Sequence, residues 1–244
     1  MRIAIVADIH SNLAAFQAVL HHAEGTGPID RLWCPGDIVG YGPDPRACIR
    51  LVRRYPHTAV AGNHDLAAIA KISTANFNAP GARAAAWTGT RLKAEDREYL
   101  DGLPEVAKEG EFTLVHGSLR APVEEYLVSL EAAQEQFRRM ETRYSILGHT
   151  HQPFLAEELG DGKIEMEPWW DGDRIELGER RLIISPGAVG QPRDGDPRAA
   201  YALYDTEAGT LTLHRVEYDI ASTQKRIRAV RLHFWLAERL SFGR

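Results

Sequence analysis

Residues able to bind metal ions follow five short apolar runs of this 244-residue chain. The segments concerned are "VADIHSN", "CPGDIVGYG", "AGNHD", "LVHGS" and "LGHTH". Their candidate donors are Asp8, His10, Asp37, Asn63, His116, His149 and His151, and two further polar residues, His64 and Asp65, directly follow Asn63. A lone Asp or His at a strand end usually caps a turn or packs in the core. Five successive occurrences favour one shared site instead.

Such a cluster calls for cations, because buried carboxylates and imidazoles would otherwise carry costly unpaired charge. Carboxylate, imidazole and amide donors without thiolate suit Mn, Fe, Zn, Co or Ni. Seven donors exceed the needs of one four- to six-coordinate ion and fit two ions that share a carboxylate. Two ions about 3.5–4 Å apart can clamp a phosphoryl oxygen and generate hydroxide near neutral pH. The donor set therefore predicts a dimetal site for phosphoryl chemistry.

Strands and helices alternate in the part of the chain that carries the first donors. Apolar runs at 3–7, 31–35 and 57–61 are separated by helical patterns at 11–25 and 44–55. This order predicts a layered α/β fold with polar groups at the carboxyl ends of its strands. Further strands are expected at 112–116 and 144–148, and helices at 79–103 and 130–141. Residues 152–218 have a β-rich pattern, and about 222–240 predicts one amphipathic C-terminal helix.

Composition is that of an ordinary globular protein, with 44% hydrophobic and 26% charged residues. No repeat or linker interrupts residues 1–244, which predicts a single domain. A net charge of −5 argues against a general binder of nucleic-acid backbones. Two cysteines are too few for a disulfide framework and are expected to be reduced. An early Asp8 leaves no room for a signal-peptide apolar region, and no membrane-spanning run exists, so a cytoplasmic location without a membrane partner is expected.

The five motifs resemble those of the calcineurin-like metallophosphoesterase superfamily, whose pattern is D-x-H, G-D, G-N-H-[D/E], H and G-H-x-H. In this chain they are Asp8-x-His10, Gly36-Asp37, Gly62-Asn63-His64-Asp65, His116 and Gly148-His149-Thr150-His151. The segments "DIHSN", "GDIVGYGPDP" and "SPGAVGQPRDGDPRAAYA" are similar to small prokaryotic YfcE-type phosphodiesterase-like members, to about residue 205. The resemblance implies a four-layer α-β-β-α sandwich with two mixed β-sheets flanked by helices. The C-terminal helix lies outside the resemblance.

The resemblance also implies a role for each donor. The implied ligands are Asp8, His10 and His151 for one ion, Asn63, His116 and His149 for the other, and Asp37 bridging both. His64 would face the substrate and donate a proton or hydrogen bond to the leaving oxygen. Asn63 could also touch a phosphate oxygen. The implied cofactors are two divalent transition-metal ions, with manganese preferred over Fe, Zn, Ni or Co.

The second motif departs from that of the superfamily's protein phosphatases, which carry G-D-x-V-D-R-G where this chain has "GDIVGYG". Gly40 replaces the Asp that orients the catalytic His, and Tyr41 replaces an Arg that clamps phosphate, so protein phosphatase activity is not expected. The orienting partner of His64 stays open, and Asp65 either fills that role or caps the next helix.

Three residues are candidate substrate contacts. Tyr41 could stack on a base, with loop packing as the alternative. Arg193 could bind a phosphate through paired hydrogen bonds, with Asp194 beside it. The alternative is that Arg193 and Asp194 form a plain surface ion pair.

The predicted function is metal-dependent hydrolysis of a phosphodiester or nucleotide pyrophosphate bond in a small substrate, by attack of a dimetal-bridging hydroxide. Alternatives are a phosphomonoesterase with the same centre and a non-catalytic scaffold of the same fold. The expected partner is a small phosphorylated molecule, with nucleotides among the candidates. Nucleic acid is not expected as a partner, and a homo-oligomer stays open.

Overall fold

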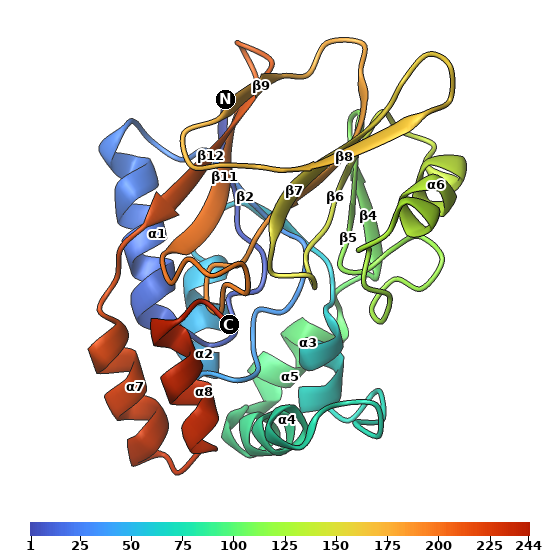
Figure 1. Ribbon diagram of the computed structural model, residues 1–244. Helices are drawn as coiled ribbons and strands as arrows, with labels where there is room; N and C mark the ends of the chain where they lie inside the picture. The colour runs from blue at the N-terminus through green and yellow to red at the C-terminus, as the bar shows by residue number, and fades with distance from the viewer.

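Two six-stranded mixed sheets stack between layers of helices in the computed structural model, which describes residues 1–244 (Figure 1). The first sheet consists, in spatial order, of β3 (His57–Ala59), β2 (Arg31–Cys34), β1 (Arg2–Ile5), β11 (Ala199–Asp205), β12 (Thr210–Val216) and β9 (Arg174–Glu176). The second consists of β4 (Val106–Glu109), β5 (Phe112–Val115), β6 (Tyr144–Ile146), β10 (Arg181–Pro186), β7 (Pro153–Glu158) and β8 (Ile164–Pro168). The predicted four-layer sandwich is confirmed.

Parallel pairing in each sheet places the functional loops at a common edge. β1 pairs in parallel with β2, and β2 with β3. In the second sheet β6 pairs in parallel with both β5 and β10. Because parallel strands end at the same edge, the polar segments that follow them are brought together.

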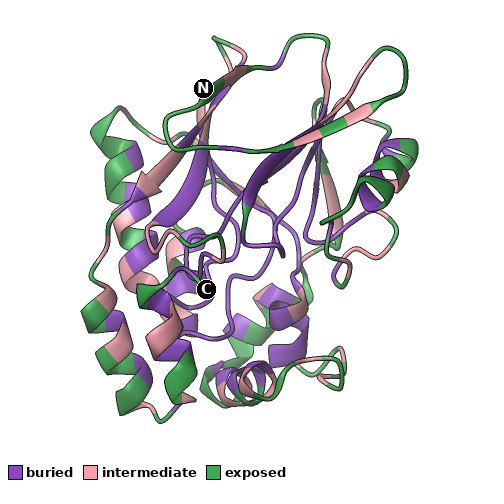
Figure 2. Cartoon of the chain, in the orientation of Figure 1, coloured by how far each residue is buried: buried purple, intermediate pink, exposed green.

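Apolar clusters hold the layers to one another. Ile5 and Trp33 of the first sheet pack with Ile146 and Ile184 of the second, filling the space between the sheets. The helices α1 (Leu13–Gly25) and α2 (Pro45–Val52) cover the outer face of the first sheet, and α6 (Leu130–Arg139) covers that of the second. Burying a side chain such as Phe16 contributes about 1.5–3 kcal/mol. Figure 2 shows this buried interior continuing into the loops at the strand ends.

The helix predicted across residues 79–103 is in fact two helices. Together with α3 (Asn63–Ala68), the helices α4 (Ala79–Arg91) and α5 (Ala94–Asp101) lie below the strand ends in Figure 1. Leu92 leaves the helical conformation, with ψ of 134°. The Asp96 carboxylate then accepts a hydrogen bond from the Lys93 N–H at 2.9 Å, which starts α5.

The prediction of a single C-terminal helix at about 222–240 was also wrong. The chain forms α7 (Ile220–Ala229), α8 (Phe234–Glu238) and the short 3₁₀ helix η1 (Arg239–Ser241). Arg231 turns the chain with a φ of 59°, and His233 Nδ1 accepts from the Trp235 N–H at 3.2 Å to begin α8. No helix of this structure combines the length and apolar character needed to cross a bilayer.

Candidate metal centre

The loops after the parallel strands bring six of the seven predicted donors into two groups that share a residue. The groups are Asp8, His10, Asp37 and His151, and Asp37, His116 and His149. Within each group the donor atoms lie within 4.8 Å of one another. None of these side chains is more than 3% exposed. Asp37 is common to both groups, as a bridging carboxylate must be.

Main-chain carbonyl groups orient the imidazoles of the centre. Each of three histidines points Nδ1 at a carbonyl oxygen, so that the ring is protonated there and the Nε2 lone pair faces the centre. These contacts are His10 to Val39 at 3.1 Å, His116 to Pro35 at 2.9 Å and His151 to Gln191 at 2.6 Å. His149 is reversed, because its Nε2 faces the Glu124 carbonyl at 3.2 Å.

The positions of the donor nitrogen and oxygen atoms are compatible with cations bound between them. The Nε2 atoms of His10 and His151 are 3.0 Å apart, and with protons on both Nδ1 atoms their lone pairs meet head-on. Asp37 Oδ2 and Asn63 Oδ1 are buried without a hydrogen-bond partner. Buried acceptors without a donor are costly, and a metal ion would satisfy them. The donor chemistry suits divalent transition metals.

Burial and neighbouring charge set the protonation of the candidate ligands. Burial lowers the pKa values of His10, His149 and His151, which keeps these rings neutral. For His116, burial acts in the same direction, but the Asp37 carboxylate outweighs it and raises the pKa to about 9. Since a ligand imidazole must be neutral, metal binding at His116 competes with a proton.

Most of the predicted ligands lie on strained backbone. Five have positive φ angles, namely Asp8 (53°), His10 (46°), Asp37 (54°), His149 (64°) and His151 (59°). A left-handed non-glycine residue costs about 1–2 kcal/mol, and such residues cluster at functional sites. Close packing holds the loops in place, because a Cβ added at Gly62 would overlap the Asp37 carboxylate.

His64 is held beside the two ligand groups by aromatic packing. The main-chain N–H of His64 donates to Asp37 Oδ1 at 2.9 Å, and the residue is only 4% exposed. The ring centroid lies 4.2 Å from that of Tyr41, 4.8 Å from Phe77 and 5.0 Å from His10. Its Nδ1 is buried without a partner. Burial lowers the pKa of His64 to about 4, so the ring is neutral near pH 7.

Asp65 supports the second motif and caps α3 rather than contacting His64. Its carboxylate accepts hydrogen bonds from the N–H groups of Ile38 at 3.3 Å, Val39 at 2.9 Å and Gly62 at 3.1 Å. Burial, followed by the neighbouring Asp37 charge, raises the pKa of Asp65 to about 7. Asp65 therefore ties the loop that presents Asp37 to the start of α3.

The three candidate substrate contacts lie in different surroundings. Tyr41 is 6% exposed and packs beneath the C-terminal helices. Arg193 Nη2 donates to the Tyr41 hydroxyl at 3.4 Å and to Gln191 Oε1 at 3.1 Å. Asp194 instead accepts from Arg215. Their roles toward a substrate stay predictions.

One further residue at the centre carried no sequence signal that identified it. Tyr126, in the loop before α6, stacks on His149 with ring centroids 3.8 Å apart and is 48% exposed. Tyr126 belongs to no motif, and only the folded chain brings it to the centre.

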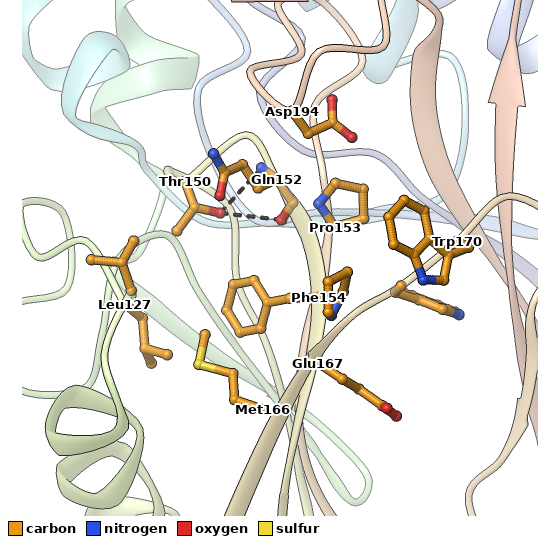
Figure 3. A pocket seen from close by; sticks show the side chains of 12 residues that line it. Leu127, Thr150, Gln152, Pro153, Phe154, Met166, Glu167, Trp170 and Asp194 are labelled. Carbon is orange, nitrogen blue, oxygen red and sulfur yellow. Dashed lines mark hydrogen bonds between the residues drawn. The ribbon is translucent and has the colours of Figure 1, made fainter.

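A groove of about 400 Å³ adjoins the loop that carries His149 and His151 (Figure 3). Thr150 and Gln152 line one side of it, and Phe154, Met166 and Trp170 line another. No predicted metal ligand lines the groove. Trp170 is 66% exposed there, whereas its neighbour Trp169 is 2% exposed and packs between the sheets.

Comparison with known proteins agrees with this geometry. Residues 1–209 match the calcineurin-like phosphoesterase superfamily domain. An uncharacterized protein of Methanocaldococcus jannaschii is 36% identical over 99% of this chain and 98% of its own length. The symmetrical bis(5'-nucleosyl)-tetraphosphatase of Escherichia coli O1:K1 is 27% identical over 84% of this chain and 69% of its own length.

Solved structures extend the comparison to the whole chain. A metallophosphoesterase from Sphaerobacter thermophilus is 44% identical, covers 100% of this chain and 99% of its own, and superimposes with a TM-score of 0.90. The E. coli phosphoesterase YfcE is a distant neighbour, at 18% identity over 89% of this chain and 100% of its own, with a TM-score of 0.43. On the strength of the domain match and the full-length relatives, the chain belongs to the calcineurin-like phosphoesterase superfamily.

Proposed function

We propose that this protein is a metal-dependent phosphoesterase that hydrolyses a phosphodiester or nucleotide pyrophosphate bond of a small substrate. The observation that carries the proposal is the pair of buried donor groups sharing Asp37, with His64 beside them. Asn63 completes the second group through its unpartnered Oδ1. Manganese is the preferred ion, and two ions are expected per chain.

Divalent ions held by these donors would supply Lewis acidity toward the phosphoryl oxygens and make a water molecule acidic enough to act as nucleophile near pH 7. The chain's own residues supply position and charge. The carbonyl contacts to His10 and His151 hold both Nε2 atoms on the centre. His64 stands next to His10, where its neutral ring can donate an N–H hydrogen bond to the leaving oxygen.

Arg193 supplies a fixed positive charge at the same place. Its guanidinium carbon lies 5.8 Å from the centroid of the Tyr41 ring, which is 4.7 Å from that of His10, so the guanidinium lies near the centre. A planar guanidinium matches the oxygens of a phosphate. Arg193 is therefore proposed to bind the phosphate that undergoes hydrolysis.

The groove beside Thr150 offers room for the remainder of the substrate. Its lining by Phe154, Met166 and Trp170 suits an apolar or aromatic substituent on the phosphate. The name of the E. coli relative, a tetraphosphatase acting on bis-nucleosyl compounds, supports a nucleotide as that substituent.

The test is turnover of bis-p-nitrophenyl phosphate by protein loaded with manganese. Metal-dependent hydrolysis is expected, and His64→Ala should retain both ions while turnover falls by about 10²- to 10⁴-fold. His21→Ala, on the exposed face of α1, is the matched control and should behave as wild type. Bound metal without turnover of any phosphoester would overturn the proposal in favour of a non-catalytic role.

A further inference from the structure

The C-terminal segment, residues 220–244, packs against the loops of the metal centre, although the family match ends at residue 209. Its helix α7 lies beside α1, which begins just after the first motif (Figure 1). Leu236 and Leu240 pack against Tyr41, whose ring centroid is 4.7 Å from that of His10. The cavity left between the segment and His10 is about 10 Å³, at most the room for one water molecule. The C-terminal segment is therefore in close contact with the wall of the site.

One buried hydrogen bond joins this segment to the first motif. The hydroxyl of Thr223, in α7, donates to the side-chain oxygen of Asn12 at 3.1 Å. Both residues are buried. A second acceptor within reach of the hydroxyl, the Asp219 carbonyl, is farther away at 3.4 Å. A hydroxyl has a single proton to donate, and the shorter contact assigns that proton to Asn12.

Asn12 in turn connects two loops that serve the first donor group. It lies two residues after His10, and its Nδ2 donates to the Gly190 carbonyl at 2.9 Å. The next residue, Gln191, has the carbonyl that accepts from Nδ1 of His151. One amide side chain therefore ties the loop of His10 to the residues that orient His151.

The end of the chain makes a second contact with the same region. The Gly195 N–H donates to the Gly243 carbonyl at 3.0 Å, and the Arg193 N–H donates to the His151 carbonyl at 3.2 Å. The packing there is tight, because a Cβ added at Gly243 would lie 2.6 Å from main-chain atoms of Asp196. The C-terminal segment thus supports the loops of the first donor group at separate points.

The second donor group is held by other parts of the chain. His116 points Nδ1 at the Pro35 carbonyl, and His149 contacts the Glu124 carbonyl and the Tyr126 ring. No hydrogen bond joins the C-terminal segment to either imidazole. The segment is therefore placed to affect one ion site more than the other.

We propose that Thr223 is a positioning residue for the first donor group. By fixing Asn12, its hydroxyl holds the loops of His10 and His151 in the arrangement in which both Nε2 atoms face one ion. Hydrogen bonds of this outer kind orient metal ligands and so set the affinity of the site. The inference rests on the part of the proposed function that gives each donor group its own ion, and it requires no particular substrate.

The experiment measures manganese affinity separately at each site, by electron paramagnetic resonance of the free ion, in two full-length backgrounds. His149→Ala leaves only the first donor group complete, and His10→Ala leaves only the second. Thr223→Val keeps the shape of the side chain without its hydroxyl, and should weaken manganese binding about 10- to 100-fold in the His149→Ala background. In the His10→Ala background the change should be less than about threefold.

Two further variants separate the hydroxyl from a general effect of substitution in α7. Thr223→Ser restores the hydroxyl and should return the affinity to within about threefold of the His149→Ala parent. Ser222→Ala removes an exposed hydroxyl from the preceding position and should leave both affinities unchanged. Urea unfolding of each metal-free variant is measured alongside, because loss of a buried hydrogen bond also lowers the stability of the fold.

The ring-nitrogen resonances of the histidines provide a readout that needs no metal. His10 and His151 each point Nδ1 at a carbonyl oxygen, and nitrogen chemical shifts in the metal-free protein report these contacts. Thr223→Val should shift the ring resonances of these two histidines and leave those of His116 in place. Single His→Ala variants assign the signals.

The outcomes separate this inference from the proposed function. If Thr223→Val weakens both sites equally or neither, or if Thr223→Ser recovers nothing in a folded protein, Thr223 does not position the first group and the inference fails. If neither background binds manganese, the dimetal centre of the proposed function fails. In that case selective shifts of the His10 and His151 resonances still support the positioning role, and unchanged shifts overturn it.

Discussion

Gly40 lies against the imidazole of His64 so closely that a Cβ at position 40 would be 2.6 Å from Nδ1 and 2.8 Å from the His64 Cβ. Gly40 also has a φ of 95°, which L side chains rarely adopt. The space that an orienting carboxylate would need is therefore occupied by the imidazole itself. Tyr41 and Phe77 position the ring by contact instead.

Gly40→Ala should displace His64 without removing a metal ligand. We expect turnover of bis-p-nitrophenyl phosphate to fall by about 10- to 100-fold while metal content stays at the wild-type level. The losses of turnover caused by the two substitutions should not be additive. The double variant Gly40→Ala/His64→Ala should turn over no more slowly than His64→Ala alone. Additive losses would mean that Gly40 acts on the reaction through another group.

Asp65→Asn should loosen the loop that presents Asp37. An amide has one acceptor oxygen where the carboxylate has two, so at least one of the three main-chain N–H bonds is lost. We expect the free energy of unfolding to fall by about 1–3 kcal/mol and metal affinity to weaken about 10- to 100-fold. Urea unfolding and metal titration measure the two effects. Asp161→Asn, in an exposed turn, is the control, and equal behaviour of both variants would show that Asp65 does not support the centre.

Metal stoichiometry tests whether Asp37 bridges two ions. Because Asp37 belongs to both donor groups, Asp37→Ala should lose both ions. His149 belongs to one group, so His149→Ala should keep one ion per chain. Elemental analysis after gel filtration counts the ions. An Asp37→Ala protein that holds as much metal as His149→Ala would show that the carboxylate is not shared.

A histidine cluster away from the centre predicts a pH effect on stability. Burial lowers the pKa of His214, and neighbouring His22 lowers it further. The ring of His214 stacks on Tyr201, whose hydroxyl contacts His22 Nδ1 at 3.0 Å. Since an unfolded His titrates near pH 6.5, the unfolded chain binds the proton more strongly than the folded chain does. The free energy of unfolding should therefore decrease as pH falls below about 6.5.

His214→Gln should remove this part of the pH dependence. Between pH 7.5 and 5.5, urea unfolding of the variant should show a smaller loss of stability than unfolding of the wild type. His21→Gln, on the exposed side of α1, should retain the wild-type slope. If the free energy of unfolding falls equally with pH in His214→Gln and in the wild type, His214 does not cause the effect.

The sequence predicted which donors the fold gathers, because a donor is recognised by its side-chain type. Asp8 and His10 at a strand end are recognisable as donors in any fold that gathers strand ends, and parallel pairing gathers them here. The carbonyl groups of Val39 and Gln191 that orient His10 and His151 were not predictable, because every residue has a carbonyl. Their selection depends on backbone geometry alone.

The errors at the helices arose from local hydrogen bonds that override a continuous helical pattern. No Gly or Pro marks the break at Leu92, and the signal missed was the Asp96 carboxylate three residues after Lys93. The turn at Arg231 has no breaker residue either, although His233 caps the start of α8. That turn folds α8 back against α7, and so the packing of Leu236 and Leu240 on Tyr41 could not be predicted from the sequence.

The left-handed backbone at five ligands has an evolutionary consequence. At about 1–2 kcal/mol each, the strain adds up to a large fraction of the 5–15 kcal/mol by which a typical domain is stable. Glycine at any of these positions would relieve the backbone strain, at the cost of a candidate ligand. The proposed metal centre would thus reduce the stability of the fold, and a descendant released from selection for metal binding would gain stability by losing these donors first.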